Sequence, residues 1–448
     1  MEHSFADEFV ALLRRDLPSP QVDALCCALN GSSPTSVRVN PLRSMAVSPS
    51  VDLVPWSGGV GYYLDRRPSF TLDPLLHGGA YYVQEASSMI VARVAAQYAP
   101  RFVLDLCAAP GGKSTHLASV IPSDGVVVAN EVIKSRASIL RENCIKWGSG
   151  NIVVTNSDPR CFAALGGMFD LLVVDTPCSG EGMFRKDLSA RDEWSIEGVE
   201  NCFARSCRIL ADSWNSLKVG GILVYSTCTF NHIENESVVS WICSELSGEV
   251  VPQSWGDLGA EGVVDNGLGG HFYPSQVRGE GLFCSVIRKV SSGECTQWDS
   301  RASRKMNLPS KAEQQELDRW VRSPLNWRLV GKTIYGYNSA MSGIIEELLS
   351  NLNVIYSGVE MGEMIRGELK PSHPLALYHD LRFESRSELE LSDALDYLRR
   401  EAVSRSLFGG DGLTLVSYRG VALGWAKVLS TRVNNNYPAA WRIRMQGE

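Results

Sequence analysis

Several features of membrane, secreted and metal-binding proteins are missing from this chain of 448 residues. No stretch of about 18 consecutive apolar residues occurs, which predicts no membrane-spanning helix. The opening stretch, MEHSFADEFVALLRRDL, lacks the basic start and apolar run of a secretory signal and is typical of an amphipathic helix. No C-x-x-C pair occurs and the seven histidines are scattered, so we expect no metal site. The sequence therefore predicts a cytoplasmic protein whose 12 cysteines are free thiols.

An excess of positive charge is also missing, because the formal net charge is −7. Taken over the whole chain, this value argues weakly against nucleic-acid binding. A local basic patch is still compatible with it. The C-terminal stretch GWAKVLSTRVNNNYPAAWRIRMQGE holds Lys427, Arg432, Arg442 and Arg444 against the single acid Glu448. This end is either a phosphate-binding surface or a solvated tail.

The chain has no internal repeats, but its pattern changes along its length. From about residue 80 to 290, apolar runs such as RFVLDLC, GVVVANE, DLLVVDTPC and GGILVYSTC alternate with helix-like stretches. This alternation predicts an α/β fold with a doubly wound, mostly parallel sheet, to which HFYPSQVRGEGLFCSVIRKV adds an antiparallel edge. We expect an N-terminal α/β accessory region at 1–78, the α/β domain at 79–290, a polar linker at 291–312, a small intermediate domain at 313–371 and a β-rich module at 372–448.

A cofactor loop is predicted in VLDLCAAPGGKSTHLASVI, where a strand, a tight loop of small residues and a helix follow one another. The loop lacks the G-x-G-x-x-G spacing of a nicotinamide-binding fold, and Cys107 stands where a P-loop would have its first glycine. Glu131, Asp158 and Asp175 follow or end the next three strands, where acids suit ribose hydroxyls and an adenine amino group. The pattern favours S-adenosylmethionine, an adenosyl cofactor without pyrophosphate, over a loop that merely turns the chain.

Two cysteines follow neighbouring strands of the predicted sheet. Cys178 in DTPCSGEG follows the strand that ends at Asp175, and Cys228 in YSTCTF follows the next strand. Since parallel strands end at one edge of a sheet, both thiols should face the cofactor cleft. A thiolate that adds to C6 of a pyrimidine makes C5 a nucleophile for a methyl group, while an acid near N3 and N4 stabilises the addition. A lone cysteine after a strand usually only packs, and strand order alone leaves open which thiol attacks.

The motifs DLCAAPGGKST, DTPCSGEGMFRKD and YSTCTFNHIENE, in this order, resemble those of the RNA cytosine-C5 methyltransferases of the Nop2/Sun group, which includes ribosomal RNA small subunit methyltransferases B and F. YYVQEASSM resembles the lead-in helix of that group. GELKPSHPLAL and GWAKVLSTRVNNNYP resemble the C-terminal half of the F branch, which ends in a PUA-like RNA-binding domain. One departure is Thr176, where the family more often has alanine.

The resemblance implies a Rossmann-like, S-adenosylmethionine-dependent methyltransferase fold and a role for each site residue. Cys228 would be the nucleophile, and Cys178 would assist release of the methylated base. Asp175 would activate the cytosine, with a secondary role for Lys113. The implied cofactor contacts are Cys107, Ala108, Ala109, Pro110, Gly111, Gly112, Lys113, Glu131, Asp158 and Asp175.

The sequence therefore predicts an enzyme that forms 5-methylcytosine in RNA and acts as a monomer. Its expected partner is 16S ribosomal RNA or the 30S subunit. We expect no binding to DNA or to a membrane. A tRNA cytosine-C5 methyltransferase on the same scaffold is the alternative. An RNA-binding assembly factor without turnover is a further one, which the two intact cysteine motifs disfavour. Arg38 in VRVNPLR and the basic C-terminal end are expected to contact phosphates or to form surface ion pairs.

Overall fold

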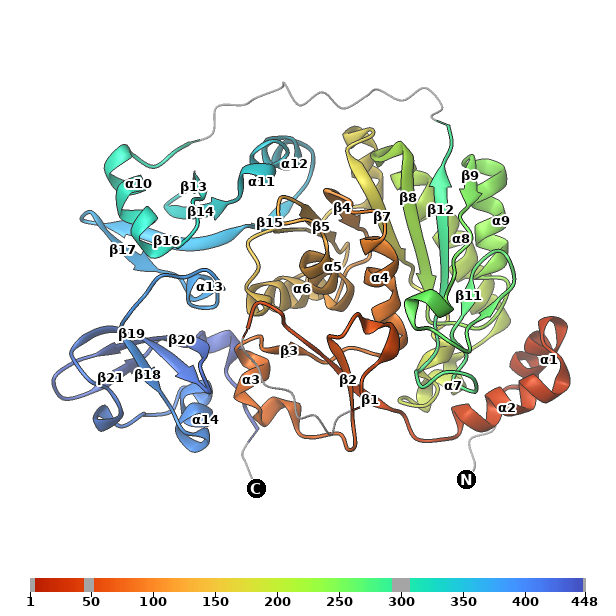
Figure 1. Cartoon of the computed structure of the whole chain (residues 1–448), viewed down its shortest axis with the longest axis horizontal. Coiled ribbons are helices and arrows are strands. Elements are labelled where there is room, and N and C mark those ends of the chain that lie inside the picture. Colours follow the sequence, from red (N-terminus) through yellow and green to blue (C-terminus); the bar gives the residue numbers. More distant parts are fainter. Residues whose placement is uncertain (1–4, 44–51, 292–306, 446–448) are drawn as a thin grey trace.

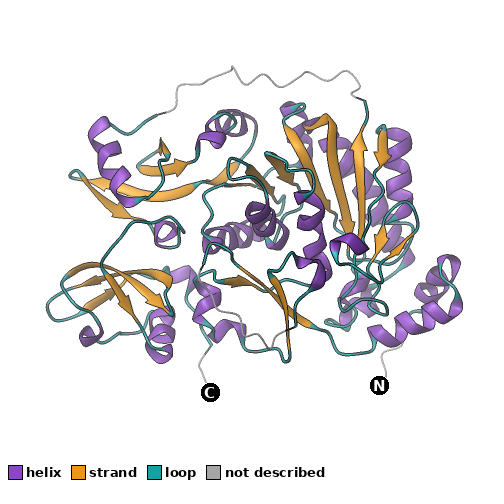
Figure 2. Cartoon of the chain, viewed as in Figure 1, coloured by secondary structure: helices purple, strands orange, loops and turns teal. Residues whose placement is uncertain are grey.

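The computed structural model describes residues 5–43, 52–291 and 307–445, which form one large central sheet and three smaller sheets (Figures 1 and 2). Most of the linker expected at 291–312 lies outside these residues. Within the described ranges, no helix combines the length and apolar character that crossing a bilayer requires. No cluster of His, Cys, Asp and Glu side chains in the same ranges is suited to hold a metal ion, and the cysteines described there are free.

The central sheet has 10 strands, in the order β10-β11-β12-β8-β7-β4-β5-β6-β15, with β9 paired to β12. Its middle is parallel and consists of β4 (Phe102–Asp105), β5 (Val126–Asn130), β6 (Ile152–Thr155), β7 (Phe169–Asp175) and β8 (Leu217–Thr227). One antiparallel edge contains β9 (Gly248–Val250), β10 (Val264–Asp265), β11 (Gly270–His271) and β12 (Phe283–Lys289). The predicted α/β class, with a mostly parallel sheet and an antiparallel edge, is confirmed.

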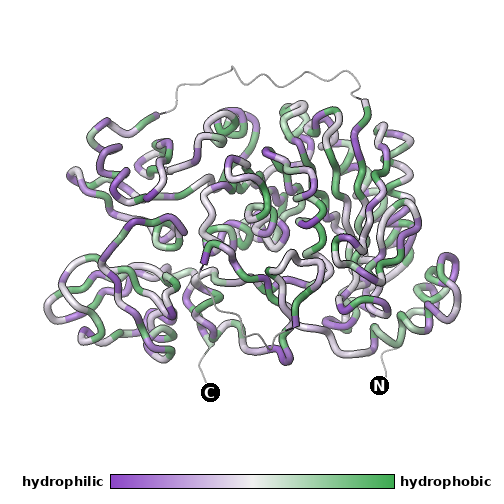
Figure 3. The backbone as a smooth tube through the Cα atoms, viewed as in Figure 1, coloured by the Kyte–Doolittle hydropathy of each residue, from purple (hydrophilic) through white to green (hydrophobic). Residues whose placement is uncertain are grey.

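Helices cover both faces of this sheet because successive residues of a strand point to opposite sides. On β4, Val103 packs on one side and Leu104 on the other, and both are fully buried. The first side is covered by α4 (Ile90–Ala96), α5 (Gly112–Val120) and α6 (Lys134–Trp147). The second is covered by α8 (Ile196–Ser213), α9 (Glu236–Glu245) and α12 (Ile345–Asn351). Hydrophobic segments accordingly run along the strands of the sheet and the helices beside them (Figure 3).

The N-terminal region contributes two helices and a small antiparallel sheet. Helices α1 (Asp7–Asp16) and α2 (Ser19–Leu29) precede β1 (Thr35–Val39), which pairs with β2 (Gly61–Leu64) and β3 (Tyr81–Tyr82). Phe9 on α1 packs against Phe184 and Trp194, which follow β7 in the chain. The accessory region is thus joined to the α/β domain through a shared apolar core.

The segment after the linker forms an antiparallel sheet of its own and also adds one strand to the central sheet. Its own sheet has the order β13 (Asn326–Val330), β14 (Thr333–Tyr337), β16 (Val359–Ile365) and β17 (Glu368–Pro371), with α10 (Lys311–Leu317) beside it. Strand β15 (Val354–Ser357) follows α11 (Ser339–Ser342) and α12, and pairs antiparallel with β6 of the central sheet. This segment is therefore anchored on the α/β domain.

The C-terminal module is a four-stranded sheet of β18 (Arg386–Glu388), β19 (Gly412–Tyr418), β20 (Val421–Val428) and β21 (Val433–Asn435), preceded by α13 (His373–Ala376) and packed with α14 (Leu391–Arg399). Figure 1 shows it beside α3 (Pro74–His77) of the N-terminal region, where Val421 joins a core with Ala80 and Tyr81. The four cations of the basic end, Lys427, Arg432, Arg442 and Arg444, are all exposed.

Candidate active site

Most of the predicted site residues line a cavity of about 400 Å³ at the carboxyl ends of β4 and β7, whereas Gly111 and Cys178 are not part of its lining. In the strand order β6-β5-β4-β7-β8 the chain winds outward from β4 in both directions, so the loops after β4 and β7 leave a crevice between them. The lining includes these residues predicted from the sequence: Cys107, Ala108, Ala109, Pro110, Gly112, Lys113, Asp175 and Cys228. Tyr82, Glu85, Met183, Lys186 and Glu280 also line it and were missed.

The loop between β4 and α5 forms one wall of the cavity. Gly111 has a φ of 113°, a backbone conformation that side chains disfavour, and its carbonyl accepts a hydrogen bond from the Thr115 N–H at 3.0 Å. The Ala108 N–H donates to the Asn130 carbonyl at 2.8 Å, which ties the loop to the end of β5. A Cβ at Gly112 would lie 3.3 Å from the Tyr82 ring. Glycine at 111 therefore suits the backbone path, and a side chain at 112 would crowd the Tyr82 ring.

Two predicted cofactor contacts, Glu131 and Asp158, lie after β5 and β6, outside the lining of this cavity. Glu131 is buried, accepts from the Ile133 N–H at 2.9 Å, and lies 3.4 Å from Arg136. Asp158 accepts from the Arg160 N–H at 3.1 Å and so caps the turn that follows it. Both carboxylates retain further acceptor sites, and their contact with a cofactor stays a prediction.

Asp105, the last residue of β4, lines the cavity and was missed. Its Oδ2 accepts from the Ser114 hydroxyl at 2.6 Å, whereas its Oδ1 is buried without a hydrogen-bond partner among the described residues. Burial raises the pKa of Asp105 to about 7. An unpaired buried carboxylate oxygen is costly unless a donor reaches it. Its position at the carboxyl end of the strand before the cofactor loop could have identified Asp105 from the sequence.

A salt bridge spans the crevice from the start of α5 to the end of β7. The Lys113 Nζ lies 2.7 Å from Asp175 Oδ2, and the Ser226 hydroxyl donates to Asp175 Oδ1 at 2.7 Å. Burial opposes the charge on Lys113, but the Asp175 carboxylate more than offsets this effect, and the pKa of Lys113 is raised. Cys228 also contributes to the rise. A stable ammonium group thus lies close to this thiol.

The two predicted thiols lie together, with Cys178 Sγ 3.3 Å from Cys228 Sγ. They meet because β7 and β8 are parallel neighbours, with Asp175 opposite Ser226. The hydrogen bond with Cys228, together with burial, raises the pKa of Cys178 well above its ordinary value. Cys178 therefore holds its proton at neutral pH.

Two glutamates hold the loops that carry the thiols, and the sequence analysis missed both. Glu181, beside Cys178 in the chain, accepts from the Phe230 N–H at 2.6 Å in the opposite loop. Glu234 accepts from the Ser179 N–H at 2.8 Å, again across the two loops. Asn231 donates to both carboxylates, at 2.7 and 2.8 Å. This reciprocal pairing fixes the two loops relative to each other, and the acids within DTPCSGEG and YSTCTFNHIENE were its sequence signal.

The prediction that Arg38 contacts a phosphate or a surface acid is wrong, because Arg38 is fully buried. Its guanidinium donates to Gln84, Thr115 and the Gly112 carbonyl, and it lies 4.1 Å from the centre of the Trp147 ring. Burial lowers the pKa of Arg38 to about 9. Arg38 ties β1 to the start of α5 and supports the cofactor loop from behind.

Three protein-family models match the chain, in consecutive segments. The N-terminal domain of 16S rRNA methyltransferase RsmF matches residues 5–86. The model of 16S rRNA methyltransferase RsmB/F matches residues 94–288, the part that carries the cavity. The methyltransferase RsmF PUA domain matches residues 384–443, which confirms the predicted PUA-like character of the C-terminal module.

Solved structures of other proteins share the fold of nearly two thirds of the chain. A methyltransferase homologue from Pyrococcus horikoshii is 27% identical, with a TM-score of 0.51 over 63% of this chain and 99% of that chain. NSun6 from P. horikoshii, solved with the S-adenosylmethionine analogue SFG, is 20% identical, with a TM-score of 0.54 over 65% of this chain and 100% of that chain. The second likeness concerns the fold alone.

Two relatives that match this chain over nearly their whole length have the same name. Ribosomal RNA small subunit methyltransferase F of Aliivibrio fischeri strain ES114 is 30% identical over 96% of this chain and 96% of its own length. The protein of the same name from Enterobacter sp. strain 638 is 30% identical over 97% of this chain and 95% of its own length. The chain therefore belongs to the 16S rRNA methyltransferase RsmB/F family and is an rRNA methyltransferase of the F type that depends on S-adenosylmethionine.

Proposed function

We propose that the enzyme methylates C5 of a cytosine in 16S ribosomal RNA, through a covalent bond between Cys228 and C6 of the base. The observation that carries the proposal is that Cys228 lines the same cavity as the Lys113–Asp175 salt bridge, with the Cys178 sulfur 3.3 Å from its own. C5 of cytosine is a poor nucleophile, and addition of a thiolate to C6 is a way to activate it. All these groups come from one chain, which supports action as a monomer, and a ribosomal RNA substrate supports a cytoplasmic location.

The first step that the residues support is addition. The Cys228 thiolate forms a bond to C6, and the electron pair of the C5–C6 double bond becomes available at C5. Asp175 can accept a hydrogen bond from the exocyclic amino group of cytosine, a donor that uracil lacks. The Lys113 ammonium, held ionised by Asp175, can stabilise negative charge on the sulfur or on the base. The hydrogen bond to Asp175 favours cytosine over uracil.

The last step is release. C5 must lose its proton to a base, after which the C6–S bond breaks and its electron pair returns to the Cys228 sulfur. The Cys178 thiol keeps its proton and lies at hydrogen-bond distance from that sulfur. It can therefore donate to the leaving thiolate and ease its departure. Cys178 thus acts in release, while the attack belongs to Cys228.

The residues present fit S-adenosylmethionine, which supplies an electrophilic methyl group when bound. The Oδ1 of Asp105 is a buried acceptor without a partner in the described chain, suited to a positively charged amino group. The loop from Cys107 to Lys113 offers backbone groups and little side-chain bulk at the cavity wall. Glu131 and Asp158 remain the proposed contacts for the nucleoside part.

Binding of S-adenosylmethionine should tighten as the pH rises from 6 to 8, by up to about tenfold, since a carboxyl with a pKa near 7 goes from mostly protonated to mostly ionised. The ligand carries positive charge, so it favours the ionised form of Asp105. Lys113 and Cys178 hold their protons across this range because both pKa values are raised. Calorimetric titration at pH 6, 7 and 8 measures the effect. The variant Asp105→Asn should bind with a flat pH profile, and an unchanged slope in that variant would rule out Asp105 as the titrating group.

The proposed substrate is tested by methylation of defined RNA. The purified enzyme with labelled S-adenosylmethionine should transfer methyl groups to small-subunit RNA, as naked RNA or within 30S particles, and transfer little to tRNA. Bisulfite sequencing of ribosomal and transfer RNA from a deletion strain should show the loss of 5-methylcytosine in 16S ribosomal RNA. Loss confined to tRNA would favour the alternative substrate, and no transfer to any RNA would leave only an assembly factor.

A further inference from the structure

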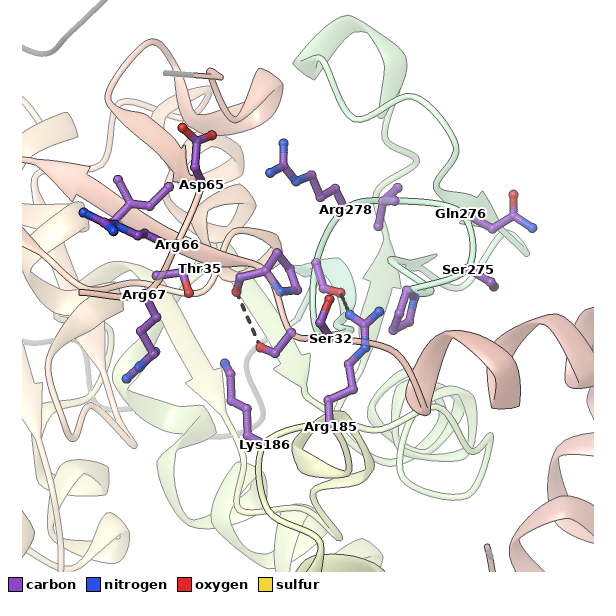
Figure 4. A pocket seen from close by; sticks show the side chains of 16 residues that line it. Ser32, Thr35, Asp65, Arg66, Arg67, Arg185, Lys186, Ser275, Gln276 and Arg278 are labelled. Atoms are coloured by element: carbon purple, nitrogen blue, oxygen red, sulfur yellow. Dashed lines mark hydrogen bonds between the residues drawn. The ribbon is translucent and has the colours of Figure 1, made fainter. Parts of the chain in front are cut away.

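A second hollow, of about 950 Å³, lies next to the catalytic cavity and has no part in the mechanism above. Four separate segments of the sequence surround it (Figure 4). They are the entry to β1 (residues 32–35), the turn after β2 (64–67), the turn that follows the Cys178 loop (185–186) and the stretch before β12 (274–279). We call this hollow the basic groove.

The basic groove is rich in cations. Its charged lining residues are Arg66, Arg67, Arg185, Lys186 and Arg278, against the single acid Asp65. Such an excess is notable in a chain with a net charge of −7. A local positive field of this kind attracts a polyanion.

Most of these cations have groups available to a ligand. Arg66 and Arg67 are exposed and form no ion pair within the described ranges. Arg278 is exposed too, stacked 4.1 Å from the centre of the Tyr63 ring and paired with Asp52.

Arg185 differs from the other cations because its role is structural. It donates to the carbonyls of Ala28 and Gly279 at 2.8 and 2.9 Å, and so ties α2 to the groove wall. Arg185 therefore builds the groove, while Arg66 and Arg67 are its most accessible charges.

The basic groove and the catalytic cavity adjoin at Lys186, which lines both. Glu280 stands on the cavity side of this junction, 3.9 Å from the Lys186 ammonium, and accepts from Ser33 on the groove side. A strand of nucleic acid lying in the groove would thus pass directly by the cavity that contains Cys228.

We propose that the basic groove binds the phosphates of single-stranded RNA on either side of the target nucleotide. The inference rests on the proposed function, because a base whose C6 must reach Cys228 has to leave any stack or pair. Phosphates next to an extruded base need cations at the mouth of the cavity, where Lys186 lies. Hydroxyl and amide groups of Ser32, Thr35, Ser275 and Gln276 add donors suited to phosphate and 2′-hydroxyl groups.

The test measures binding of a fluorescent single-stranded 12-nucleotide RNA to the full-length protein, without cofactor, as a function of salt. The double variant Arg66→Gln/Arg67→Gln should bind about tenfold more weakly at low salt. The slope of log affinity against log salt should fall in magnitude by about 1.4, since each phosphate contact on a single strand contributes about 0.7. The variant Asp65→Asn should bind two- to threefold more tightly, by an order-of-magnitude estimate for removing one like charge.

The matched control is Arg101→Gln/Arg288→Gln, which removes the same charge at the opposite, amino-terminal edge of the sheet. It should leave affinity and slope unchanged. An unaltered slope in the groove variant, or an equal loss in the control, overturns the proposal. The proposal is also overturned if a duplex of the same length binds as tightly as the single strand and loses as much affinity in the Arg66→Gln/Arg67→Gln variant. This test measures binding and not methyl transfer. If the enzyme showed no methyl transfer but the binding results were as expected, the proposed function would be refuted and the groove would still be an RNA-binding site.

Discussion

Replacing Cys228 by alanine is expected to reduce methyl transfer by more than about 1,000-fold, because the step that makes C5 of the base nucleophilic depends on this sulfur. No neighbouring group can replace it. Cys178 is 3.3 Å away, but its raised pKa keeps it in the unreactive thiol form. The measurement is incorporation of labelled methyl groups into small-subunit RNA at saturating cofactor.

Two controls separate loss of chemistry from loss of fold. Cys228→Ala should bind S-adenosylmethionine as the unaltered enzyme does, since the cofactor loop and Asp105 lie on the other side of the cavity, on β4 and α5. Cys243→Ala, which changes another half-buried free cysteine on α9, should keep full activity. Methyl transfer by Cys228→Ala at more than a few per cent of the normal rate would show that the base is activated in another way.

Replacing Cys178 by alanine should have a different effect, which is accumulation of the enzyme–RNA adduct. The variant still carries the attacking sulfur and the Lys113–Asp175 pair, so addition proceeds. It lacks the proton that eases departure of the Cys228 thiolate. Turnover should therefore fall by about 100-fold or more, while a large share of the protein migrates with RNA attached on a denaturing gel.

The double variant Cys178→Ala/Cys228→Ala is the control for the adduct. Without the attacking sulfur it should give no RNA-linked band. A band that persists in the double variant would point to a different nucleophile, and normal turnover by Cys178→Ala would remove its role in release.

Much of the fold and the centre of the site could be predicted because both depend on local patterns. The apolar runs that alternate with helices define the parallel strands, and parallel strands bring their carboxyl ends to one edge. This rule alone put Asp175, Cys178 and Cys228 on that edge. The division of roles between the two thiols came from the resemblance and stays a prediction.

What could not be predicted depends on contacts between distant segments. Arg38 was expected at the surface, but β1 turns it inward against Trp147, more than 100 residues away in the chain. Strand β15 pairs with β6 across some 200 residues, a register that no local pattern encodes. The basic groove likewise arises only when four separate segments meet. Glu181 and Glu234 were visible in the motifs, but their crossed bonds require the folded loops.

The most direct test of the central claim locates the covalent bond. Cys178→Ala enzyme is incubated with S-adenosylmethionine and substrate RNA, digested with nuclease and protease, and analysed by mass spectrometry. We predict a methylated cytidine nucleotide attached to Cys228 in the peptide that contains YSTCTF. A nucleotide attached to any other residue, or no attached nucleotide despite methylated RNA, would contradict the account.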